Sequence, residues 1–126
     1  MGKFLVAGIV QRETIVKVDR IPIEYAGVTV KPDTVFMNTG GDAYNESIAL
    51  KWLGNSVDFM TMIGREDGME LLNPPDCEVE LVTDYVLPRL RQTPTAVVFY
   101  DSSRKQQIFE DTKDIRDVAY DEDLFR

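Results

Sequence analysis

The residues best suited to chemistry in this 126-residue chain follow two adjacent glycines. Gly40 and Gly41 have no side chains, so a ligand could approach the main chain closely there. Asp42 and Asn45 are three residues apart, and in a helix this spacing places both side chains on one face. A carboxylate beside an amide can accept and donate hydrogen bonds to vicinal hydroxyl groups. The structural alternative is that Asp42 is an ordinary helix cap and the glycines form a tight turn.

A second candidate group follows the first apolar segment of the chain. Gly8 is followed by the polar residues Gln11, Arg12 and Glu13. Gln11 and Glu13 are two residues apart, so in an extended chain their side chains point the same way. Ligands of open α/β sheets bind outside the carboxyl ends of the strands, which is where these residues would lie. Taken alone, these residues are better explained by a solvated turn.

The elements that would position these residues can be read from hydrophobic patterning. The apolar run at residues 3–10 predicts a strand buried on both faces, typical of α/β sheets. A short strand over residues 34–38 leads into the glycines, and a helix over residues 42–53 follows them. Tyr44 and Trp52 lie at helical spacing on the apolar side of this helix, so we expect both in the core.

Much of the remaining chain consists of short apolar or alternating segments separated by turns. Further strands and a short helix are expected at residues 14–18, 57–63, 69–72, 79–82, 85–90, 95–100 and 106–109. Several of the later strands alternate as antiparallel strands do, with residues 101–104 as a hairpin tip. Residues 120–126 have the acidic start of a helix that stops after about one turn. This end indicates either an element cut short or a frayed acidic tail.

Composition excludes several classes of function. The net charge of −8 and the pI near 4.5 disfavour nucleic acid and anionic membranes as partners. The absence of histidine excludes imidazole catalysis and His-based metal sites. A single cysteine, Cys77, cannot form a disulfide within the chain, which indicates a reducing, cytoplasmic setting. The acidic cluster within residues 110–123 could attract a divalent cation, but a solvated acidic surface is far more common, so we expect no metal site in this chain.

The glycine-rich segment also carries a family resemblance. Residues 40–47 read Gly-Gly-Asp-Ala-Tyr-Asn-Glu-Ser, and Gly54 and Gly64 follow at fixed distances. This pattern resembles the N-terminal signature of the PfkB family, the ribokinase-like sugar and nucleoside kinases. Gly8 with Glu13, the turn Gly64 to Gly68, and Pro94-Thr95 before an apolar strand are similar to further family features.

The resemblance implies an α/β fold. The chain would be the N-terminal portion of a ribokinase-like fold, with a partial Rossmann-like parallel sheet, helices and a small β-sheet lid. The expected α/β core segments are residues 3–10, 41–75 and 110–126, and the expected lid strands lie within residues 14–38 and 85–109. Family members often pair through the lid, so a homodimer is implied.

The resemblance also implies a sugar site. Residues matching the family's sugar-binding positions are Gln11, Glu13, Gly40, Gly41, Asp42 and Asn45, with Val98 and Tyr100 reaching the site from the lid. Glu13 stands where the family usually has Asp, and Asp42 stands where ribokinases usually have Lys. The resemblance therefore implies a small-molecule sugar as partner without implying ribose.

The implied activity is phosphoryl transfer from ATP to a sugar hydroxyl, with ATP and Mg²⁺ as cofactors. The family's catalytic base is an Asp in a Gly-Ala-Gly-Asp motif near the C-terminus, beside the nucleotide site. This chain contains no such motif, so we expect no catalytic residue in it and no activity of the chain alone. The alternative is a non-catalytic module that binds a polyol or dimerises through its sheet.

Overall fold

The computed structural model describes residues 2–72, 74 and 79–119. Its elements in chain order are β1 (Lys3–Ala7), β2 (Gln11–Lys17), β3 (Val35–Gly40), α1 (Asp42–Trp52), β4 (Ser56–Gly64), α2 (Met69–Leu72), β5 (Val86–Leu90), β6 (Thr95–Tyr100), β7 (Gln106–Asp111) and the 3₁₀ turn η1 (Ile115–Asp117). The expected helix after the glycines and the strand over residues 95–100 are thus confirmed.

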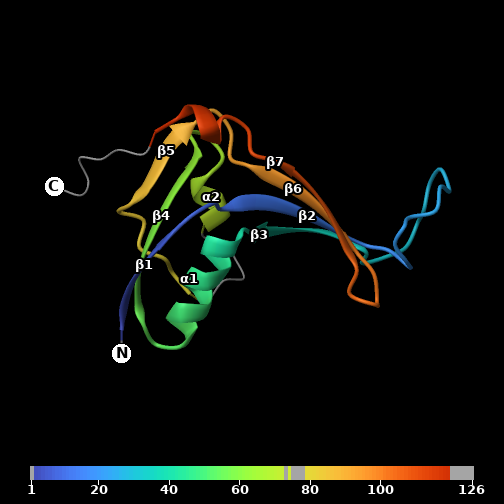
Figure 1. The fold of residues 1–126 in the computed structure, drawn as a ribbon, viewed down its shortest axis with the longest axis horizontal. Coiled ribbons are helices and arrows are strands. Elements are labelled where there is room, and N and C mark those ends of the chain that lie inside the picture. The colour runs from blue at the N-terminus through green and yellow to red at the C-terminus, as the bar shows by residue number, and fades with distance from the viewer. Residues whose placement is uncertain (1, 73, 75–78, 120–126) are drawn as a thin grey trace.

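The strands form two sheets that extend in different directions (Figure 1). One is a parallel sheet in the order β1-β4-β5, and the other is a mixed sheet in the order β3-β2-β6-β7. In the mixed sheet the central strands β2 and β6 are parallel, and each has an antiparallel partner outside it. The expected α/β fold class, a parallel sheet with helices beside a second sheet, is confirmed.

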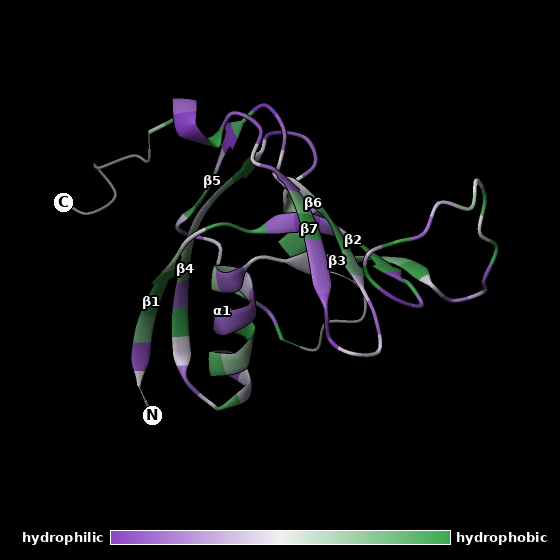
Figure 2. Ribbon diagram, turned by 45° about the vertical axis from the view of Figure 1, so that its right-hand side comes forward, coloured by the Kyte–Doolittle hydropathy of each residue, from purple (hydrophilic) through white to green (hydrophobic). Residues whose placement is uncertain are grey.

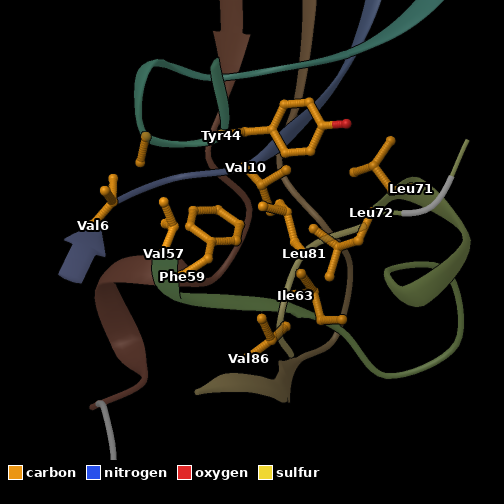
Figure 3. Packing of buried hydrophobic residues seen from close by; sticks show 11 residues of the cluster. Val6, Val10, Tyr44, Val57, Phe59, Ile63, Leu71, Leu72, Leu81 and Val86 are labelled. Carbon is orange, nitrogen blue, oxygen red and sulfur yellow. The ribbon is translucent and has the colours of Figure 1, made fainter. Parts of the chain in front are cut away.

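The core lies between α1 and the parallel sheet (Figure 3). Strand β4 alternates, and its inward side chains Val57, Phe59 and Ile63 are almost fully buried. The ring of Tyr44 on α1 meets the ring of Phe59 edge to face, with centroids 6.3 Å apart. Leu72 of α2 closes one end of this cluster. The core therefore fixes α1, and with it the residues at its start, against the parallel sheet.

Strand β1 departs from the sequence-based expectation. It ends at Ala7, and Phe4 and Leu5 are 41% and 56% exposed instead of buried on both faces. The reason is its position, since β1 lies at the edge of the parallel sheet and α1 packs across one side of it (Figure 2). A continuous apolar run cannot distinguish a covered strand from one whose second face is open.

The strand expected at residues 79–82 is also wrong. Within the described residues, this segment makes one isolated parallel bridge, between Val82 and Asp58 of β4. Leu81 still reaches the core, so the apolar pattern reflected burial of a side chain without a ladder of main-chain hydrogen bonds.

The expected burial of Trp52 is wrong, whereas that of Tyr44 is confirmed. The buried stripe of α1 runs through Ala43, Tyr44 and Ser47, and Trp52 at the end of the helix lies to one side of it with 63% of its surface exposed. A serine can be buried in this stripe because the Ser47 hydroxyl donates a hydrogen bond to the carbonyl of Ala43 and needs no other partner.

The boundary expected for the lid needs a correction. Residues 86–90, which we placed within the lid range 85–109, form β5 and pair with β4 in the parallel sheet. The mixed sheet resumes only at Thr95. Two short strands in succession gave no sign that the chain changes sheets between them, since Arg91 to Pro94 reads as an ordinary turn.

Two expectations fall outside the described residues, namely those on Cys77 and on the helix start at residues 120–126. Among the described helices, none is long and apolar enough to cross a membrane.

Candidate functional site

The candidate site lies where the chain passes between the two sheets. It passes from β1 to β2 through residues 8–10, from β3 to α1 at Gly41, and from β5 to β6 through residues 91–94. The first two crossings are in contact, since the carbonyl oxygen of Ile9 lies where a Cβ of Gly41 would be. The N–H of Arg12 in β2 donates to the carbonyl of Pro94 over 2.9 Å, and the N–H of Gly8 donates to the carbonyl of Met60 in β4 over 3.1 Å. The ends of β2 and α1 are thereby held close together.

Gly41 is required by both conformation and space. Its φ of +99° with ψ of 141° belongs to a region that residues with a side chain rarely adopt. A Cβ at this position would also overlap the carbonyl oxygen of Ile9. The sequence-based reason for this glycine, a close main-chain approach, is therefore met within the protein itself, by the crossing segment from β1.

Gly40 makes room for the carboxyl group of Glu13. The two residues belong to neighbouring strands, and a Cβ on Gly40 would overlap the Glu13 carboxylate. Gln11, which is buried, donates from Nε2 to Oε2 of Glu13 over 2.8 Å. This bond fixes the orientation of the Glu13 carboxylate and leaves its second oxygen, Oε1, for another donor.

A cleft of about 430 Å³ opens beside these residues. Its lining residues come from β1 and the crossing after it, from β2, from the start of α1 and from β7: Ala7, Gly8, Ile9, Gln11, Glu13, Gly41, Asp42, Ala43, Asn45, Glu46, Ile108 and Glu110. The structure thus brings Gln11, Glu13, Gly41, Asp42 and Asn45 to one cleft, with Gly40 directly beneath the Glu13 carboxylate. A volume of this size suits a small organic ligand.

The first turn of α1 presents free polar groups to this cleft. Gly41 is the residue that caps the helix, so Asp42 does not serve as the side-chain cap considered above. The side chains of Asp42, Asn45 and Glu46 have no hydrogen bond or ion pair with any other described residue. The main-chain N–H groups of a first helical turn also lack helical acceptors. Donors and acceptors for a polar ligand therefore converge here.

Val98 and Tyr100 do not line the cleft, although sequence reasoning placed them there. Val98 lies opposite Ile15 on one side and Ile108 on the other, so all three share the cleft-facing side of the mixed sheet. Besides Gln11 and Glu13 of β2, the lining residues from this sheet are Ile108 and Glu110 of β7.

Sequence reasoning missed Glu46, Ile108 and Glu110. Glu46 lies four residues after Asp42, so helical spacing alone would have placed it on the same side of α1. Ile108 and Glu110 depend on the register between β6 and β7, which sequence alone does not determine.

A compact hydrogen-bond network holds the third crossing. The buried hydroxyl of Thr93 donates to Oδ1 of Asp67 over 2.7 Å and accepts the main-chain N–H of Gly64 over 2.8 Å. The guanidinium of Arg12, on the face of β2 away from the cleft, donates to the main-chain carbonyl of Asp67 over 3.1 Å. This network links the mixed sheet to the end of β4. It includes the turn from Gly64 to Gly68, which is similar to a family feature.

Two further carboxyl groups, those of Asp101 and Asp114, hold the hairpin between β6 and β7 and the segment that follows β7. Asp101 accepts hydrogen bonds from the hydroxyl of Ser103 and from main-chain N–H groups including that of Ile21, and the Ser103 hydroxyl is the main cause of its lowered pKa. Asp114, after β7, accepts the N–H of Arg91, and this bond lowers the pKa of Asp114. Asp114 thus joins the segment after β7 to the third crossing.

Comparison with known proteins agrees with this architecture. The model of the pfkB family carbohydrate kinases matches residues 1–124. The chain belongs to this family. A search of curated proteins gives no match.

Solved structures extend the comparison. A provisionally assigned ribokinase from Agrobacterium tumefaciens has a TM-score of 0.76 at 17% identity, covering 95% of this chain and 39% of the other. A nucleoside kinase from Burkholderia thailandensis in complex with inosine has a TM-score of 0.66 at 24% identity, covering 85% and 36%. The ribokinase of Arabidopsis thaliana with ribose and ATP has a TM-score of 0.56 at 27% identity, covering 85% and 35%. This pfkB-family chain therefore spans little more than a third of the length of these kinases.

Proposed function

We propose that this chain forms the sugar-binding part of an ATP-dependent carbohydrate kinase. The observation that carries the proposal is the meeting of Glu13, Asp42 and Asn45 at one cleft, beside a turn that requires glycine. Membership of the pfkB family and the likeness to kinases that hold ribose or inosine support it. Because its proposed co-substrate is ATP, we propose that the protein acts in the cytoplasm.

The residues have complementary roles in this proposal. Oε1 of Glu13 and the carboxylate of Asp42 accept hydrogen bonds from sugar hydroxyls, and the amide of Asn45 donates to a hydroxyl oxygen. Gln11 holds Glu13 in place through its bond to Oε2. Together they orient the acceptor, so that one hydroxyl faces the position from which a phosphoryl group arrives.

The cleft does not fit the phosphates of ATP or their magnesium ion. Phosphates are bound by Lys, Arg and main-chain N–H groups, and the described lining of the cleft contains carboxyl groups without Lys or Arg. Within the described residues, no group of acidic, cysteine or histidine side chains is arranged to hold a metal. We therefore propose that ATP, Mg²⁺ and the catalytic base belong to residues outside this chain.

Ligand binding tests the proposal. Isothermal titration of the chain with ribose and with inosine should detect at least one of them, and Glu13→Gln or Asn45→Ala should weaken that affinity about 10-fold or more, as expected for loss of a hydrogen bond involving charge or a buried polar group. Gln107→Ala, an exposed residue on the far side of the mixed sheet, is the matched control. Unchanged affinity in both site variants would contradict the assignment.

A kinase assay tests whether this chain lacks the groups that catalyse phosphoryl transfer. The chain with ATP, Mg²⁺ and a bound sugar should give no sugar phosphate, because positioning of the acceptor alone does not supply phosphate binding or a base. Sugar-dependent phosphate transfer by this chain would refute the placement of the catalytic base elsewhere.

We also propose that two copies pair through the mixed sheet. Its face away from the cleft exposes Val35, Met37 and Phe109 to 63%, 63% and 58%. Apolar side chains grouped on one sheet face favour association. Light scattering should give a dimer mass that Met37→Asp with Phe109→Asp reduces to a monomer. Leu53→Asp, at a residue just after α1 that is 76% exposed, should leave the dimer mass unchanged. A monomeric wild type would refute this pairing.

A further inference from the structure

The cleft has a pronounced charge asymmetry that its proposed function does not by itself require. Four of its lining residues carry carboxyl groups, namely Glu13 on β2, Asp42 and Glu46 on α1, and Glu110 on β7. No Lys or Arg belongs to the described lining. The acidic side chains come from the helix α1 and from two strands of the mixed sheet, β2 and β7, so they lie on more than one side of the space.

These carboxyl groups are not neutralised by neighbours in the described part of the chain. Asp42, Glu46 and Glu110 have no ion pair or hydrogen bond there, and Glu13 accepts one bond, from the uncharged amide of Gln11. The nearest basic residues along β2 are engaged elsewhere. Arg12 lies on the opposite face and binds the Asp67 carbonyl, and the Lys17 ammonium stands over the ring of Phe36, 5.7 Å from its centroid.

The carboxyl groups also do not converge on a point. Within the described residues, they form no cluster that could hold a metal ion. Their effect is therefore a negative potential throughout the cleft, which the concave shape focuses although Asp42, Glu46 and Glu110 remain exposed to solvent. The partial positive charge at the start of α1 offsets only about half a unit of charge.

We infer that the acceptor is a sugar without a negatively charged group, and that the cleft binds an amine-bearing sugar more tightly than its neutral counterpart. A phosphate or carboxylate on the ligand meets like charge from three elements, whereas an ammonium meets opposite charge and free acceptors. This inference rests on the proposed function, because it assigns a substrate class to the same cleft. Glu46 and Glu110 act here as residues that determine specificity.

Matched ligands that differ in charge provide the test. Titration of the chain with glucosamine, glucose and glucuronate, and with ribose and ribose 5-phosphate, should rank affinity as cation, then neutral, then anion, with about tenfold or more between the ends of each series at low salt. Raising the ionic strength should compress this ranking, since salt screens charges that face solvent.

Variants identify the source of the discrimination. Glu46→Gln with Glu110→Gln keeps the size of both side chains and should reduce the ratio of cation to anion affinity several-fold while leaving neutral sugar bound. Glu66→Gln, an exposed acid outside the cleft, should leave the ratio unchanged. Circular dichroism confirms that each variant is folded.

The outcomes separate the two proposals. Neutral and anionic sugars bound equally well, or a ratio unaffected by the double variant, would overturn the charge inference while the sugar-binding function stands. Failure of every sugar to bind would overturn the proposed function and the inference together.

Discussion

Replacement of Gly41 by alanine tests the turn on which the cleft depends. Alanine at φ +99° and ψ 141° costs about 1–3 kcal/mol in main-chain strain. Its Cβ would also overlap the Ile9 carbonyl oxygen and lie 3.2 Å from Cα of Val10, and relief of such crowding costs about 1–3 kcal/mol more. We therefore expect Gly41→Ala to lower the free energy of unfolding by about 2–6 kcal/mol.

Gly27→Ala is the matched control. Gly27 also has a positive φ, +70°, but nothing lies within 4 Å of the position that its Cβ would occupy. This variant should lose only the strain of the left-handed conformation, about 1–2 kcal/mol. Urea unfolding followed by circular dichroism gives both values, provided that the dependence on urea concentration stays the same. Equal losses for the two variants would refute the argument that crowding against the first crossing makes Gly41 necessary.

Three further predictions concern buried polar groups. Thr93→Val should cost about 1–3 kcal/mol for each partner that it abandons, the Gly64 N–H and the Asp67 carboxylate, and Thr93→Ser should retain most of the stability in the same urea titration. Thr61→Val should be neutral or stabilising by about 1 kcal/mol, because the buried Thr61 hydroxyl has no partner among the described residues; a clear loss would contradict this. Because hydrogen bonds lower the pKa of Asp101 in the folded state, its contribution to stability is present above about pH 3.8, its ordinary value, and is lost as the pH falls through the lower folded value. Thermal melts should therefore show wild type and Asp101→Asn converging below pH 3.8.

Sequence patterns predicted best those elements whose structure is determined by residues within one short segment. The helix from Asp42 to Trp52 follows from a glycine turn and apolar residues at helical spacing, and both lie within one short segment. The grouping of Asp42 with Asn45 at the cleft follows from the same helix geometry. The position of Glu13 beside them required the family resemblance, since nothing local to β2 indicates that it pairs with β3.

Errors arose where a property depends on distant partners. Whether β1 is covered on one face or two, and whether residues 86–90 join the parallel or the mixed sheet, is determined by strand order and not by their own residues. Trp52 was misplaced because the polar Ser47, which occupies the centre of the buried stripe, does not register as apolar. The contribution of Glu110 could not be predicted from the sequence, because it depends on the register between β6 and β7.

The position of the cleft has a mechanical consequence. One wall is the parallel-sheet body with α1, the other is the mixed sheet, and only a few slender connections such as residues 8–10 and 91–94 run between them. A ligand that binds Glu13 and Asn45 at once bridges the mixed sheet and α1. We therefore expect its affinity to depend on how rigidly these connections hold the two parts. Substitutions in the Asp67–Thr93 network, which lies outside the cleft, should then weaken binding of a ligand that they do not contact.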